Sequence, residues 1–136
     1  MYRANVGRYR ENQVMLSTPG EILLALYDGA IRFTGQARIA IQDNDPAAKG
    51  KSIGSVMAIL AELTSTLDHD RAPDLCQNLS MLYNYMTDRL QHAGLHMDIE
   101  ALDEVIGHLK KLREAWAEAI VLAGDYNQLK EAAVGQ

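Results

Sequence analysis

The chain has 136 residues, one cysteine and a formal net charge of −5 at pH 7. This length suits one domain built around a single hydrophobic core. The negative charge and the lack of a basic tract argue against nucleic acid or an anionic membrane as the main partner. A lone cysteine excludes an internal disulfide and favours a reducing compartment. With no signal-peptide pattern and no uncharged run long enough to span a bilayer, we expect a cytoplasmic protein without membrane insertion.

The leader, residues 1–17, shows no regular pattern but carries several large apolar side chains. Val6 and Tyr9 are three positions apart, so they would share one face if a helical turn formed there. A disordered chain end is the alternative interpretation.

The first helix is predicted to begin at Thr18. Thr18 can cap it, Pro19 stands at the first helical position, and Glu21 follows three residues after the cap, which makes a capping box. Apolar or small residues then recur every three or four positions, a spacing typical of antiparallel bundle packing. These residues are Leu23, Tyr27, Ala30, Thr34, Ala37 and Ile41.

Three further helices are predicted from similar spacing and from their end signals. They run from Pro46 to about Leu67, from Pro73 to about Ala93, and from about Asp98 to Gly124, with a polar turn over 68–73. Gly94 suits the left-handed position after the third helix, and Gly124 is expected to end the fourth. Short connections make neighbouring helices antiparallel. The sequence therefore predicts an all-α, up-down-up-down four-helix bundle over 18–123, in one domain with the leader and a flexible tail over 124–136.

The third predicted helix carries more apolar surface than one packing seam needs. Its leucine and methionine residues at 75, 79, 82, 86 and 90 share one helix face. Met81, Tyr83 and Tyr85 add apolar surface beyond that face. We interpret the surplus as a surface for a partner, and full burial within the bundle is the alternative.

No arrangement of residues predicts catalysis, a metal or a cofactor. The Glu-x-x-His motif of di-iron bundles is absent, and Glu104 with His108 has no matching pair. His92 and His96 flank an expected helix end, so we predict exposed loop histidines instead of metal ligands. Cys76 is expected to be a quiet core thiol. The sequence favours a binding module, with a phosphotransfer or metal-binding bundle as the alternative class.

Four segments match one known family in the same order along the chain. They are a tyrosine-bearing leader running into Asn-Gln-Val at 12–14, Leu-Tyr-Asp-Gly-Ala at 26–30, Leu-Tyr-Asn-Tyr-Met at 82–86 and Arg-Glu-Ala-Trp at 113–116. On these residues the chain resembles the flagellin export chaperone family (FliS) from about residue 2 to residue 119.

The resemblance implies a cytoplasmic helical bundle that is not an enzyme and uses no cofactor. Such proteins bind the disordered C-terminal segment of flagellin, prevent its premature polymerisation and help deliver it to the flagellar export gate. In the family the leader packs on the bundle and covers part of the flagellin site, and Val6 and Tyr9 match the leader positions involved. Whether the leader competes with flagellin or assists its binding stays open, and another flagellar export substrate is an alternative client.

From the surplus apolar surface and the resemblance together, we expect an apolar groove bordered by the third helix. For each of its residues, plain core packing is the alternative. The expected partner-binding residues are Val6, Tyr9, Tyr27, Leu82, Tyr83, Tyr85, Met86 and Leu90.

Overall fold

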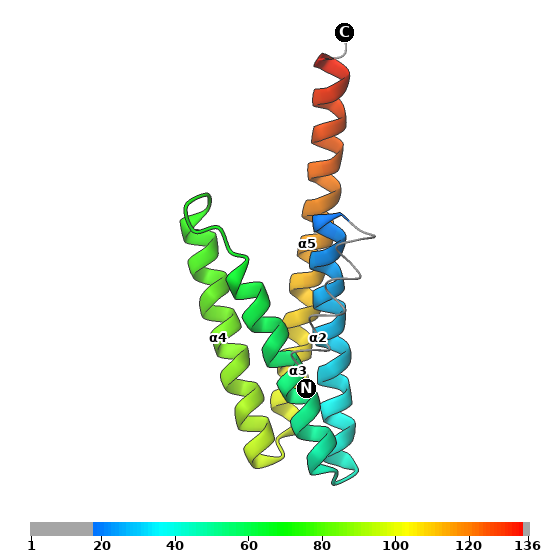
Figure 1. The fold of residues 1–136 in the computed structure, drawn as a ribbon, viewed down its shortest axis with the longest axis vertical. Coiled ribbons are helices and arrows are strands. Elements are labelled where there is room, and N and C mark those ends of the chain that lie inside the picture. The colour runs from blue at the N-terminus through cyan, green and yellow to red at the C-terminus, as the bar shows by residue number, and fades with distance from the viewer. Residues whose placement is uncertain (1–17, 135–136) are drawn as a thin grey trace.

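The computed structural model describes residues 18–134, without the side chains of 125–131 and 134. The four helices are α2 (Pro19–Gln42), α3 (Pro46–Ser65), α4 (Pro73–His96) and α5 (Ile99–Val134). Each helix packs against two neighbours, in the pairs α2–α3, α3–α4, α4–α5 and α2–α5. Neighbours run antiparallel (Figure 1), and no strand occurs over 18–134. The predicted all-α four-helix bundle is confirmed.

The first two helices begin where their capping residues predict. The Thr18 hydroxyl accepts a hydrogen bond from the Glu21 N–H at 3.2 Å, and the Asp45 carboxylate accepts one from the Ala48 N–H at 3.0 Å. Both caps are followed directly by proline. Proline is tolerated at the first helical position because the N–H that it lacks would have no intrahelical partner there. α4 also begins with a proline, Pro73.

The core contains every predicted seam residue of α2 except the half-buried Leu23, and it contains Leu79, Met86 and Leu90 of the five apolar residues predicted to share one face of α4. On α4 the buried face includes Tyr83, whereas Leu75 is 52% exposed and Leu82 is half-buried. Cys76 and Tyr83 replace Leu75 and Leu82 while the other three positions stay buried, so the buried face is turned by only part of the roughly 100° that separates consecutive helical residues. The buried residues of α4 are Cys76, Leu79, Tyr83, Met86, Leu90 and Ala93.

Two predicted helix ends are wrong. Gly94 lies inside α4, and Met97, with φ of 54°, takes the left-handed position instead. A Cβ added to Gly94 would come within 3.2 Å of the Ile53 Cδ1 atom, so the glycine serves close packing of α4 on α3. Gly124 does not end the last helix, because α5 continues to Val134. The predicted flexibility of residues 124–136 stays a prediction.

The bundle is closed at one end and open at the other. The α2–α3 and α4–α5 turns lie together at the closed end, while the α3–α4 hairpin diverges from the α2–α5 pair at the opposite end (Figure 1). Beyond the start of α2, the last part of α5 projects from the bundle (Figure 1). Val6 and Tyr9 lie outside the described residues. Within the described part, no helix is long and apolar enough to cross a bilayer.

Candidate partner-binding groove

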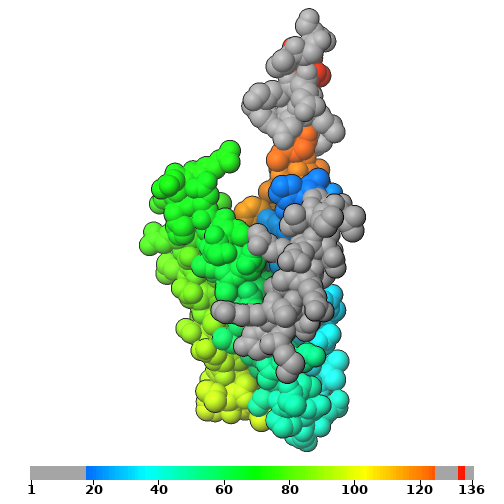
Figure 2. All heavy atoms as spheres, in the orientation of Figure 1, coloured from blue at the N-terminus to red at the C-terminus, as the bar shows by residue number. Residues whose placement is uncertain are grey.

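An apolar groove lies at the open end of the bundle, between the tip of the α3–α4 hairpin and the α2–α5 pair. Figure 2 shows the molecule hollowed between these elements, and the cavity volume is about 240 Å³. We call it the end groove and define it by Leu23, Leu67, Leu75, Leu79, Tyr83 and Trp116. Residues from α2, α4 and α5, and from the turn after α3, therefore meet at this one surface.

The walls of the end groove are apolar side chains that the helices only partly cover. Leu23 on α2 and Trp116 on α5 are half-buried, as is Leu67, which follows the end of α3. Leu75 on the first turn of α4 is more than half exposed. Because the hairpin diverges here, no helix among residues 18–134 faces these side chains, and a partner's apolar groups would gain contact area by covering them.

The floor of the end groove is a hydrogen-bonded set of three aromatic side chains, of which two are buried and one is half-buried. The Tyr27 and Tyr83 hydroxyl groups share a hydrogen bond, and the Trp116 indole Nε1–H donates to the Tyr27 oxygen at 3.1 Å. Burial raises the pKa of Tyr83, and burial also raises the pKa of Tyr27. Both phenols therefore stay neutral near pH 7, and the set links α2, α4 and α5 without a buried charge.

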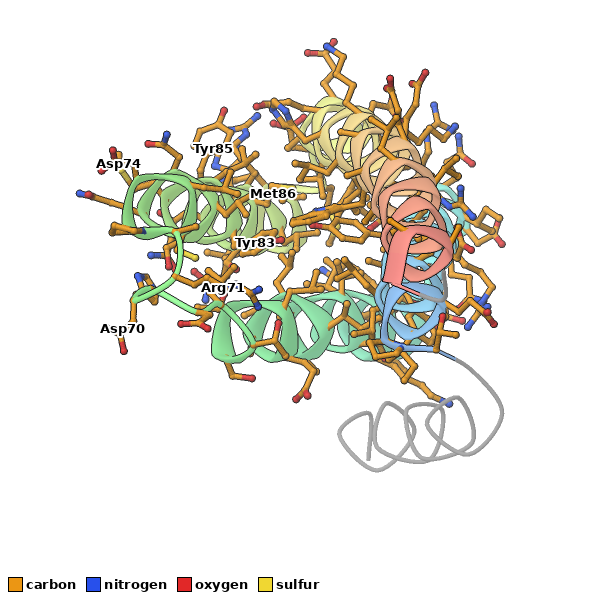
Figure 3. The ribbon with its side chains drawn as sticks, turned by 90° about the horizontal axis from the view of Figure 1, so that it is seen from above. Asp70, Arg71, Asp74, Tyr83, Tyr85 and Met86 are labelled. Carbon is orange, nitrogen blue, oxygen red and sulfur yellow. The ribbon has the colours of Figure 1, made fainter. Side chains whose placement is uncertain are left out.

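The other predicted partner-binding residues lie away from the groove surface. Among the six with described positions, Tyr83 alone lines the end groove, and Tyr27 lies behind it. Met86 and Leu90 are fully buried in the core, which is the packing role kept as their alternative. Leu82 is half-buried, whereas Tyr85 is 45% exposed (Figure 3).

Tyr85 belongs instead to a polar network between α4 and α5. Its hydroxyl donates to the Glu104 carboxylate, which also accepts from Arg89 Nε at 3.1 Å and lies 3.4 Å from His108 Nε2. The Tyr85 hydroxyl is the main cause of a lowered Glu104 pKa, and the same bond raises the pKa of Tyr85. The network holds α4 against α5 below the groove.

A second hollow, about 330 Å³ in volume, lies between the end of α2 and the start of α3. Phe33 and Ile39 line it, but so do the charged side chains of Asp43, Asp45 and Lys51. The end groove is the better candidate for an apolar partner because most of its lining is leucine and aromatic side chains, with only Asp68 and Arg71 charged.

The carboxylate of Asp98, just before α5, is expected to make the free energy of unfolding depend on pH. The Asp98 carboxylate accepts the Ala101 N–H at 3.2 Å, and this bond is the main cause of a lowered Asp98 pKa. A lowered folded-state pKa stabilises the fold above the unfolded-state value near 3.8, and the effect is lost as the pH falls through the folded-state value. Urea denaturation at pH 7 and pH 3 should show that Asp98→Asn lowers the free energy of unfolding more at pH 7.

Asp98→Ser is the matched control for this pH dependence. Serine caps a helix start well but does not titrate, so the variant should keep the cap and flatten the acid dependence. If Asp98→Asn were equally destabilising at both pH values, the carboxylate charge at this cap would have no role in acid stability.

The two histidines at the end of α4 are exposed, as predicted, but they do not lie in a loop. His92 and His96 are both helical, with ring centroids 4.6 Å apart, because the helix continues through Gly94. The His92 Nε2 atom lies 3.2 Å from an Asp98 carboxylate oxygen. No group of three or more His, Cys, Asp or Glu side chains within the described ranges is placed to hold a metal ion. Cys76 is buried as expected, with its Sγ atom 3.3 Å from the Asp68 carbonyl oxygen.

Comparison with known families shows that the model described as "Flagellar protein FliS" matches residues 1–123. The chain belongs to the FliS family. This match spans all six residues that define the end groove, together with the leader. The projecting end of α5, after residue 123, is the part of this FliS-family chain outside the match.

Named relatives of this FliS-family chain support the assignment. The Flagellar secretion chaperone FliS of Bacillus subtilis is 36% identical over 112 residues, which cover 82% of this chain and 83% of the relative. That of Salmonella typhimurium is 35% identical over 109 residues, covering 79% and 81%. That of Escherichia coli is 32% identical over 112 residues, covering 82% of each.

Proposed function

We propose that this chain is a cytoplasmic chaperone, and not an enzyme, that binds the disordered C-terminal segment of flagellin in the end groove. Binding there would prevent premature polymerisation and assist delivery to the flagellar export gate. The observation that carries the proposal is the end groove itself, where apolar side chains from α2, α4, α5 and the turn after α3 meet and no helix of the described residues covers them.

The physical demands of such a client fit this surface. A disordered segment loses chain entropy when it binds, so it needs several apolar contacts to offset that loss. Tryptophan and leucine supply large contact areas, and Trp116 is held in place by its bond to Tyr27. A groove of about 240 Å³ holds only a few side chains, so the rest of the segment must lie elsewhere on the bundle.

We place the continuation of the client along the outer surface of α4. Met81 is 63% exposed and Tyr85 is 45% exposed, and the half-buried Leu82 lies between them in sequence. Val6 and Tyr9 of the leader are proposed to share part of this site with the client. For Tyr27, Met86 and Leu90 we propose a supporting role, in which packing beneath the surface fixes the position of α4.

Calorimetric titration with the C-terminal segment of flagellin from the same organism tests this proposal. We expect saturable one-to-one binding at about 1 μM or tighter, which is roughly −8 kcal/mol, with a negative heat-capacity change. A scrambled segment of the same composition is the control. Absence of heat and of a complex would remove flagellin as the client, and the next candidates would be other flagellar export substrates.

The same titration with a chain lacking residues 1–16 measures the contribution of the leader. A leader that covers the site lowers the apparent affinity by the fraction of time that it is closed. Tighter binding without it would therefore show competition, and weaker binding would show that the leader contacts the client.

A further inference from the structure

Arg71 stands at the mouth of the end groove on the turn between α3 and α4. Its backbone N–H bonds to the Asp68 carbonyl oxygen and to the Asp68 carboxylate, each at 3.2 Å, which fixes its position in the turn. The side chain is exposed and contributes to the groove lining. In Figure 3 the Arg71 side chain points inward, in the direction of Tyr83, whereas the side chains of Asp70 and Asp74 point away from the bundle.

Three other arginines of this bundle form ion pairs that join two helices, and Arg71 differs from them in its partners. Arg38 Nε lies 2.9 Å from Asp103, Arg89 Nε lies 3.1 Å from Glu104, and Arg113 Nε lies 2.5 Å from Asp28. Arg71 has no such ion pair with any side chain that the structure describes. An arginine without an acidic partner, placed beside apolar walls, offers charge-assisted donors to an incoming carboxylate.

The other charge in the groove lining does not fill this role. Asp68 also lines the end groove, but one of its carboxylate oxygens accepts the Arg71 N–H. That carboxylate is therefore used in holding the turn. The groove thus presents apolar walls with one unpaired cation at its mouth.

We propose that Arg71 selects client segments in which an aliphatic side chain lies close in sequence to an aspartate or glutamate. The aliphatic group would lie among Leu67, Leu75 and Trp116, and the carboxylate would bind the Arg71 guanidinium. This inference rests on the proposed function for the existence of a client, and it adds the chemistry that the client must carry.

Two capped peptides test the selection directly. We would titrate the full chain with acetyl-Gly-Leu-Leu-Asp-Leu-Gly-amide and with the same peptide carrying asparagine in place of aspartate. The caps remove the terminal carboxylate, so only the side chain differs. The indole N–H signal of Trp116, the only tryptophan, reports binding in ¹H–¹⁵N spectra.

For the unmodified chain we expect the aspartate peptide to bind about three- to tenfold more tightly than the asparagine peptide. Arg71→Gln should abolish this preference while leaving the melting temperature unchanged, because the side chain is exposed. Lys110→Gln, which removes one exposed positive charge from α5, is the matched control and should keep the preference. A preference that survives in Arg71→Gln would overturn the proposal, as would equal binding of both peptides or no binding of either.

The C-terminal flagellin segment, tested alongside, separates this inference from the proposed function. Its binding should weaken about three- to tenfold in Arg71→Gln and stay unchanged in Lys110→Gln. If flagellin failed to bind while the peptide preference held, the client assignment would fall and the role of Arg71 would stand. If flagellin bound both variants equally well, the role of Arg71 would fall and the client assignment would stand.

Discussion

Replacing Tyr83 with alanine is expected to lower the free energy of unfolding by about 3–5 kcal/mol, as is usual for truncating a large buried aromatic residue. Tyr83 is only 2% exposed, and its side chain packs in the core of the bundle. Its loss would leave a cavity and would also remove the Tyr83 partner of the Tyr27 hydroxyl. Thermal unfolding followed by circular dichroism should show a melting temperature lower by about 10–20 °C.

Tyr83→Phe is the control that separates packing from hydrogen bonding. It keeps the ring and removes the hydroxyl, so we expect a loss of only about 0.5–1.5 kcal/mol. A different outcome would change the role of Tyr83. If Tyr83→Ala weakened flagellin binding but left the melting temperature at the value of the unmodified chain, Tyr83 would be a contact residue and not a core residue.

Replacing Leu75 with glutamine is expected to weaken binding of the flagellin segment by about 1.5–3 kcal/mol, or roughly 10- to 150-fold. Leu75 lines the end groove and is 52% exposed, so a client can cover it. Glutamine is a good helix former of similar size, so α4 should keep its stability. Fluorescence of Trp116 on the opposite wall provides the binding measurement.

Leu95→Gln is the matched control for this change. Leu95 lies on the same helix, near its other end, and is 79% exposed. Loss of apolar surface there should leave the affinity for flagellin unchanged. If both variants lost affinity equally, or if only Leu95→Gln did, the client would not bind in the end groove.

Local signals in the sequence predicted most of the fold. Thr18 and Asp45 act as caps over distances of three residues, and proline follows each of them, so the helix starts depend on neighbours in sequence alone. The seam of α2 repeats at helical spacing and, apart from Leu23, is buried as predicted. Helix ends were less predictable, because Gly94 is used for packing against Ile53, a residue far away in sequence.

The candidate site was only partly predictable because it depends on how helices diverge. Tyr83 was predicted as a site residue and lines the end groove, but Leu23, Leu67 and Trp116 were not predicted to belong to the site. Nothing in their spacing reveals that the hairpin tip moves away from α2 and α5. The leucines on both sides of the polar turn at 68–73 did indicate an exposed apolar surface. An apolar residue next to the turn of a helical hairpin has few neighbours that could bury it.

Because the α3–α4 hairpin packs tightly at one end and diverges at the other, small rotations about the closed end become larger displacements at the tip. At the closed end, Lys49 of α3 donates to the Gly94 carbonyl oxygen of α4 at 2.8 Å, and Gly94 packs against Ile53. A helix of 20 residues is about 30 Å long, so a rotation of about 5° moves its far end by roughly 2.6 Å. The hairpin tip can thus adjust the width of the groove to side chains of different size, and the buried hydrogen bond between Tyr27 and Tyr83 limits how far it moves.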